Sequence, residues 1–137
     1  MKVHQDRIKV ETKGLNDFII ITDRIEKIVG ESKINKGMAF VNSLHTTTAI
    51  IIQENDPTIF KDMLDLFEKI LPSNKKYEHM EEGSVNAVAH QKQNLLGNSV
   101  SIPVEEGKLV LGRWQDILFL EFFEPRQREA VVTIIGD

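Results

Sequence analysis

The sequence contains no cysteine, which excludes disulfide bonds, iron–sulfur clusters and zinc sites built from thiolates. Any metal ion would have to be bound by imidazole and oxygen ligands. No apolar run approaches the roughly 20 residues that a membrane-spanning helix requires, and the N-terminus lacks the apolar core of a signal peptide. Together with the missing cysteines, which suit a reducing compartment, these absences predict a cytoplasmic protein without a membrane partner.

The chain has no excess of positive charge either. It contains 17 lysines and arginines and 21 aspartates and glutamates, which gives a net charge of −4. This balance is unlike the concentrated positive field of a nucleic-acid-binding surface, so no nucleic acid is expected as a partner. The chain also lacks a glycine-rich phosphate loop and a serine nucleophile elbow, which removes P-loop nucleotide hydrolases and α/β-hydrolases from consideration. At 137 residues it is long enough for its own core, and we expect a single domain over residues 1–137.

Short segments rich in β-branched and alternating apolar residues account for most of the chain. The first two are expected to form a hairpin through Gly14-Leu15-Asn16, and Glu105-Glu106-Gly107 is expected to form a second, shorter hairpin turn. The pattern predicts strands over residues 3–12, 18–21, 38–43, 49–53, 100–104, 109–111, 117–123 and 130–135.

Three helices are predicted between these strands. Thr22 can cap a short first helix that ends near Gly30. The second has the clearest pattern, with Asp56 as N-cap, Pro57 at the first helical position and apolar residues at helical spacing behind it. The third, over residues 86–96, is more weakly patterned.

The segment Ile117-Leu118-Phe119-Leu120 is apolar without alternation, so both faces of its strand should be covered. A single sheet with one wet face would not provide this. Closely spaced strands with only short helices between them favour a mostly β member of the α+β class. We therefore predict an antiparallel β-sandwich with two or three inserted helices.

The stretch His45-Thr46-Thr47-Thr48 places a titratable ring beside three hydroxyls and leads directly into an apolar strand, which is typical of a site on a rigid support. His79 and His90 also lie in or beside polar segments. Imidazoles from separate segments can converge on zinc, although on spacing alone a surface or hydrogen-bonded core position is the more common role for each histidine. Glu54 follows a buried strand and could act as a ligand or a general base.

Glu121 interrupts an apolar strand, and a buried carboxylate is costly unless it is paired. It is expected to meet Arg113, Arg126 or Arg128, or else to line a cavity. These three arginines could form an anion site, because guanidinium groups suit phosphate and carboxylate, or a solvated edge. The single tryptophan, Trp114, either walls a pocket or fills the core, which is the default for so large a ring.

Several of these motifs together resemble the YjbQ-like family over almost the whole chain and in the family's order. The residues that carry the resemblance are His45-Thr46-Thr47-Thr48-Ala49, Glu54-Asn55-Asp56-Pro57, Tyr77-Glu78-His79, Glu82-Gly83, Asn86-Ala87-Val88-Ala89-His90, Leu96-Gly97-Asn98-Ser99, Gly112-Arg113-Trp114-Gln115, Glu121 and Pro125-Arg126.

The resemblance implies a homotrimer with a site at the histidine-bearing segments, a bound divalent metal ion (zinc in preference to magnesium) and a small phosphorylated substrate. The specific reaction it implies is that of a secondary thiamine-phosphate synthase, a transferase in which a thiazole phosphate nitrogen displaces diphosphate from an activated pyrimidine. The site residues it implies are His45, His79 and His90 for the metal, Glu54, Glu82 and Arg126 for catalysis, and Thr46, Thr47, Asn86 and Trp114 for the substrate.

Two positions depart from the family's pattern. Family members commonly have aspartate where this chain has Met80, and proline where it has Val88. If the missing carboxylate takes part in the chemistry, its loss favours the alternative of a non-catalytic protein that binds a metal or a small molecule and has weak incidental activity.

Overall fold

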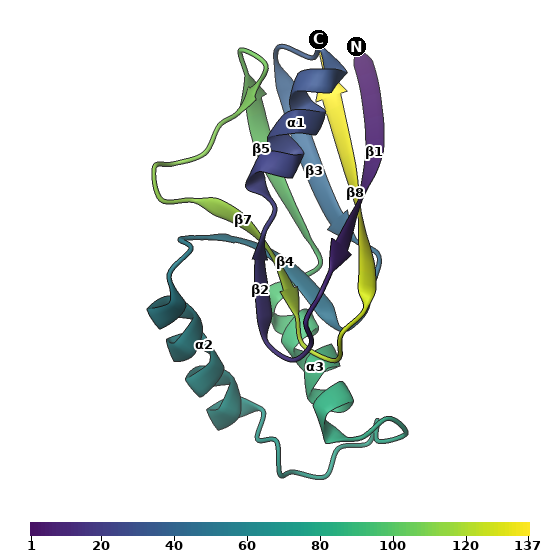
Figure 1. The fold of residues 1–137 in the computed structure, drawn as a ribbon, viewed down its shortest axis with the longest axis vertical. Coiled ribbons are helices and arrows are strands. Elements are labelled where there is room, and N and C mark those ends of the chain that lie inside the picture. Colours follow the sequence, from purple (N-terminus) through teal and green to yellow (C-terminus); the bar gives the residue numbers. More distant parts are fainter.

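A computed structural model describes all residues of the chain, from Met1 to Asp137, and its ribbon is drawn in Figure 1. The fold is α+β and mostly β, with antiparallel strands and three helices, as predicted. The elements follow one another as β1 (Lys2–Glu11), β2 (Asp17–Ile20), α1 (Thr22–Ser32), β3 (Gly37–Ser43), β4 (Thr48–Gln53), α2 (Pro57–Ile70), α3 (Ser84–Leu96), β5 (Ser99–Glu105), β6 (Lys108–Leu109), β7 (Asp116–Glu121) and β8 (Gln127–Gly136).

The strands form two sheets. The larger has the order β1-β8-β3-β5-β6, and the smaller has the order β2-β7-β4. The predicted hairpin between the first two strands is wrong, because β1 pairs with β8 while β2 pairs with β7. The connection at Gly14 to Asn16 therefore carries the chain from one sheet to the other. The short hairpin at Glu105 to Gly107 is confirmed: β5 pairs with β6, and Glu106 and Gly107 both have positive φ.

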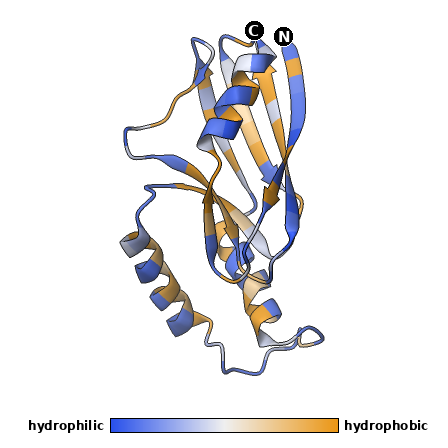
Figure 2. Ribbon diagram, viewed as in Figure 1, coloured by the Kyte–Doolittle hydropathy of each residue, from blue (hydrophilic) through white to orange (hydrophobic).

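Strand β7 lies at the centre of the molecule and is covered on both faces, as its apolar sequence predicts. Ile117 and Phe119 belong to a core formed with the large sheet and α1, whereas Leu118 and Leu120 belong to a second core formed with α2 and α3. Figure 2 shows the apolar residues gathered along these central strands. The finer prediction of a β-sandwich is not confirmed, because helices cover one face of the smaller sheet.

The helix boundaries follow local rules with one exception. Asp56 caps α2 by accepting a hydrogen bond from the Thr58 backbone N–H at 2.8 Å, and Pro57 opens the helix. The prediction that Thr22 caps α1 is wrong: its hydroxyl instead donates to Asp116 on β7 at 2.6 Å. The helix also continues beyond Gly30 to Ser32. None of the three helices is both long and apolar enough to cross a membrane.

Candidate functional site

A cavity of about 280 Å³ lies where three segments distant in the sequence meet. The first is the connection between β3 and β4, the second is the first half of α3 together with Glu82 two residues before the helix, and the third is the connection between β7 and β8 with the start of β8. The walls are predominantly polar and are formed by Leu44, His45, Thr46, Thr47, Glu82, Asn86, His90, Phe123, Arg126 and Arg128.

Seven of the ten site residues proposed from the sequence line this cavity: His45, Thr46, Thr47, Glu82, Asn86, His90 and Arg126. His79 does not line it. It borders a neighbouring cavity of about 360 Å³, and its ring packs edge-to-face on His90 with 4.8 Å between the ring centroids. His90 and His79 thus stand between the two cavities.

Glu54 and Trp114 lie away from this cavity. Glu54 follows β4 at the end opposite Thr48, and the partner strand β7 begins beside that same end, because Gln53 pairs with Asp116. Trp114 precedes β7 and is 64% exposed, with the Arg113 guanidinium 5.1 Å from its ring centroid. The expectation that the tryptophan fills the core is therefore wrong.

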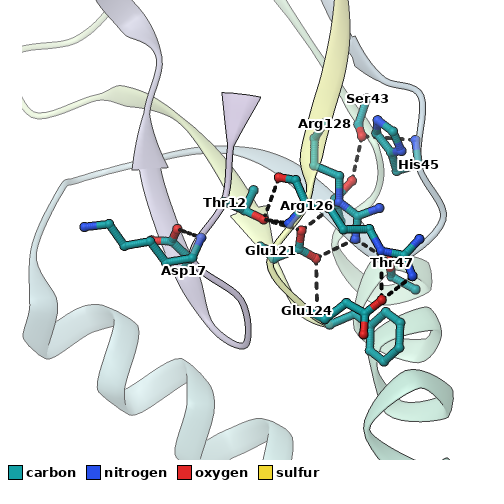
Figure 3. A network of polar contacts seen from close by, with 12 residues as sticks. Thr12, Asp17, Ser43, His45, Thr47, Glu121, Glu124, Arg126 and Arg128 are labelled. Atoms are coloured by element: carbon teal, nitrogen blue, oxygen red, sulfur yellow. Dashed lines mark hydrogen bonds and ion pairs between the residues drawn. The ribbon is translucent and has the colours of Figure 1, made fainter. Parts of the chain in front are cut away.

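A buried ion pair supports the floor of the cavity (Figure 3). The Glu121 carboxylate accepts hydrogen bonds from Arg128 Nε at 2.7 Å and from Arg128 Nη2 at 2.8 Å. The same Nη2 donates to the Thr47 hydroxyl at 3.0 Å, and the Thr12 hydroxyl donates to Glu121 at 2.7 Å. The pairing expected for Glu121 is confirmed, with Arg128 as its partner. Because all four side chains are buried, this network holds the cavity floor in one geometry.

His45 is held by the backbone of β8. Its Nε2 accepts a hydrogen bond from the Glu129 backbone N–H at 2.8 Å, so the neutral ring carries its proton on Nδ1. Burial lowers the pKa of His45, and the positive charge of Arg128 lowers it further. The imidazole is thus kept neutral. Ligation of a metal through Nε2 would require the bond to Glu129 to break.

Arg126 is the cavity's exposed cation. Its guanidinium pairs with Glu124 on the preceding connection, at 2.9 Å from Nε to the carboxylate, and this hydrogen bond raises the pKa of Arg126. The pair is about half exposed, so solvent screens it and a stronger anion can displace Glu124. Arg126 immediately precedes β8 and Arg128 is the second residue of that strand, and both line the cavity.

Asn86 contributes a buried polar group that no other residue satisfies. The side chain is only 2% exposed and its Oδ1 has no hydrogen-bond partner. It lies one helical turn before His90 on α3, and both line the cavity. A buried amide oxygen without a donor is costly, which is a common sign of a position completed by a ligand or water.

The three imidazoles do not converge on one point within this chain. No three ligand-type side chains around the cavity lie within 4.8 Å of one another. His79 and His90 are placed to provide two neighbouring imidazoles, while His45 is occupied by the Glu129 N–H. The donor set of one chain therefore fits a metal ion only in part.

Three cavity residues were absent from the site proposed from the sequence: Leu44, Phe123 and Arg128. Arg128 carried a signal in its charge: it was expected either to pair with Glu121 or to form an anion site, and the structure shows the pairing. Leu44 and Phe123 carry no such signal. Their place in the cavity follows only from how the connections fold.

Comparisons with known proteins agree on one family. The model of the family described as UPF0047 protein, YjbQ-like, matches residues 6–137. A UPF0047 protein of Archaeoglobus fulgidus is 49% identical over 128 residues, covering 93% of this chain and 98% of that protein. The protein YugU of Bacillus subtilis is 37% identical over 130 residues, covering 94% of this chain and 97% of its own length.

Solved structures agree with the fold. The crystal structure of a YbjQ-like protein of unknown function from Sulfolobus solfataricus P2 superposes with a TM-score of 0.92 at 33% identity, covering 99% of each chain. A YjbQ/UPF0047 family protein of Clostridium acetobutylicum gives a TM-score of 0.87 at 40% identity, covering 95% of this chain and 99% of that one.

Proposed function

This chain belongs to the UPF0047 (YjbQ-like) family, and we propose that it is a cytoplasmic, metal-dependent transferase acting on a small phosphorylated molecule, with thiamine phosphate as the specific product. The observation that carries the proposal is the cavity where His45, His90 and Arg126 meet. These residues come from three separate segments, and each offers a group that recognises or handles a phosphorylated ligand. Packing of the core alone does not require them to meet.

Arg126 and Thr46 are the proposed phosphate contacts. Arg126 is exposed, and its guanidinium contacts only the Glu124 carboxylate and the Phe123 ring, whose centroid is 5.5 Å away. Because solvent screens the pair with Glu124, the guanidinium can turn to a phosphate and bind it through two parallel hydrogen bonds. Thr46 is exposed at the cavity wall, and its hydroxyl makes no hydrogen bond within the chain, so it is free to bind a ligand. Arg128 is already neutralised by Glu121 and serves to fix Thr47.

His79 and His90 are the proposed metal-holding residues, with zinc the expected ion because the ligands are imidazoles. A bound divalent ion would supply positive charge to the leaving diphosphate. A third donor would come from His45, after release from Glu129, or from a neighbouring subunit of a homotrimer. Glu82, at the cavity wall, is the nearest carboxylate among the proposed catalytic residues, whereas Glu54 could contribute only across a subunit interface.

In the proposed reaction, the ring nitrogen of a thiazole phosphate forms a bond to the methylene carbon of an activated pyrimidine. The carbon–oxygen bond to diphosphate breaks, and its electron pair leaves with diphosphate. Arg126 stabilises the negative charge that develops on the departing oxygen. The neutral His45 ring can donate through Nδ1–H to a ligand oxygen, and Asn86 Oδ1 can accept a hydrogen bond from the pyrimidine amino group.

Coupling of the two precursors by purified protein tests this assignment. We expect His45→Ala and Arg126→Ala to reduce the coupling rate by a factor of about 100 or more, as expected when a group that stabilises the transition state is lost. Arg113→Ala is the matched control, because this exposed arginine lies outside the cavity and should leave the rate unchanged. Equal rates for all three variants would overturn the proposal.

One observation favours a second function, a binding protein with weak incidental activity. Met80 is exposed and directly follows His79, at the position where the resemblance to the family leads us to expect an aspartate. Replacing Met80→Asp distinguishes the two functions. A large gain in coupling rate would indicate that the natural chain is a disabled enzyme. If the natural chain is already strongly active and the substitution does not change its rate, the binding-only function is ruled out.

A further inference from the structure

A second group of metal-ligand side chains lies outside the cavity, between β1 and α1. His4 and Asp6 are two residues apart on β1 and so point to the same face of the strand, and Glu31 lies in the last turn of α1. One ring nitrogen of His4 and one carboxylate oxygen from each acidic residue lie within 4.8 Å of one another. No other three ligand-type side chains in the chain meet so closely.

A second, independent observation concerns the His4 ring, which has a nitrogen without a hydrogen-bond partner. Its Nε2 is buried and has no hydrogen-bond partner, although the side chain as a whole is only partly buried. A buried ring nitrogen without a partner costs free energy. A bound cation would give the imidazole a partner, and the carboxylates of Asp6 and Glu31 would supply the negative charge that the cation requires.

The surrounding charges allow a cation to enter. Lys27 competes for Glu31: its Nζ lies 3.9 Å from the Glu31 carboxylate, but the side chain is 78% exposed and can rotate away. Arg24 is held elsewhere, because its Nη2 donates to the Lys9 carbonyl at 2.6 Å. The Arg7 backbone N–H donates to Asp6 Oδ1, which leaves the other carboxylate oxygen free.

We infer that His4, Asp6 and Glu31 form a divalent-cation site, separate from the cavity, for a transition metal such as Zn²⁺. One imidazole and two carboxylates are a donor set that zinc accepts, with water in the fourth position. Donors in a tetrahedral zinc site are about 3.3 Å apart, so modest rotation of the exposed carboxylates closes the observed spacing. The ion would tie the edge strand β1 to the end of α1.

Metal content and thermal stability of the untagged full-length protein test this site. Metal-free protein is dialysed against Zn²⁺ and its bound zinc is measured by elemental analysis. His4→Gln and Glu31→Gln should each remove one zinc ion per chain and abolish the rise in Tm that this ion causes. Glu11→Gln is the control, since this exposed carboxylate lies on the same strand outside the cluster.

The variant His90→Gln separates this inference from the proposed metal in the cavity. If both sites exist, His4→Gln and His90→Gln each lose one ion and the double variant loses both. If the natural chain binds one ion, and His4→Gln removes it whereas His90→Gln does not, the proposed metal site in the cavity is wrong and this inference stands. The inference is overturned if His4→Gln and Glu31→Gln both retain the zinc content and the zinc-induced Tm shift of the natural chain.

Discussion

At the scale of single residues, the buried pair between Glu121 and Arg128 has the largest consequence for both stability and the site. Glu121 is fully buried and accepts two hydrogen bonds from the Arg128 guanidinium, which in turn holds Thr47. Removing one member of such a pair leaves an uncompensated buried charge. Stability and the shape of the cavity floor therefore depend on the same two side chains.

Glu121→Gln should lower the free energy of unfolding by about 3–5 kcal/mol, because Arg128 then keeps its charge without a counter-charge. Urea denaturation followed by circular dichroism would measure this loss. Glu124→Gln is the comparison, since Glu124 pairs with Arg126 at the surface and its loss should leave the midpoint nearly unchanged. Similar losses in the two variants would contradict the importance of burial.

The lowered pKa of His45 predicts a pH dependence of stability. The unfolded chain takes up a proton at this histidine as the pH falls through about 6.5, whereas the folded chain resists protonation until a lower pH. The free energy of unfolding should therefore be fully retained above pH 6.5 and should decrease as the pH falls below it. Denaturant titrations between pH 7.5 and 5 would measure the slope.

His45→Gln should make that slope smaller, because glutamine does not titrate. The exposed His79 provides the control, since His79→Gln should retain the slope of the natural chain. If the two substitutions change the slope equally, the pH dependence does not come from the burial of His45 beside Arg128.

At the scale of secondary-structure elements, backbone contact decides where glycine is required. Gly37 begins β3 opposite Gly136 of β8, and a Cβ at Gly37 would lie 1.9 Å from the Ile135 carbonyl oxygen. Gly30 is different, because it lies in α1 and a Cβ there would contact nothing within 4 Å. The two strands can approach this closely only because neither glycine has a side chain.

Alanine substitutions at these two glycines should therefore have opposite effects. Gly37→Ala should destabilise the protein by about 1–3 kcal/mol through overpacking against β8. Gly30→Ala should stabilise it by about 0.5–1 kcal/mol, because alanine has the higher helix propensity. Thermal unfolding of the two variants beside the natural chain would measure both signs, and a stabilising Gly37→Ala would disprove the close approach.

At the scale of the whole molecule, β7 connects the two cores. Its side chains alternate between the core under the large sheet and the core under α2 and α3, so neither core can form completely without it. The connection from residue 72 to residue 83 is largely exposed and makes few backbone hydrogen bonds. Stability should therefore differ strongly between these two segments.

Native-state hydrogen exchange should measure this difference. We expect the amides of Ile117 to Leu120 to exchange only through global unfolding, since both neighbours of β7 in its sheet and both cores must open first. Amides within residues 73–79 should exchange through small local openings. Exchange of β7 at a free energy well below that of global unfolding would show that the two cores open separately.

The amino-acid sequence by itself was sufficient for features that depend on near neighbours. The α2 cap at Asp56, the turn at Gly107 and the two-sided burial of β7 all follow from local residue patterns. The need to pair Glu121 also follows from a single charge in an apolar strand. Backbone geometry and the cost of burial depend on neighbouring residues in each case, so these features can be predicted from residues adjacent in the sequence.

Only the tertiary structure decided which distant segments meet. Nothing near Gly14 indicates that β1 joins β8 rather than β2, because strand pairing depends on long-range packing of whole sheets. The same holds for the cavity, which brings His45, His90 and Arg126 together while leaving Trp114 at the surface. Residue type identified the groups able to do chemistry, and chain folding selected which of them share a site.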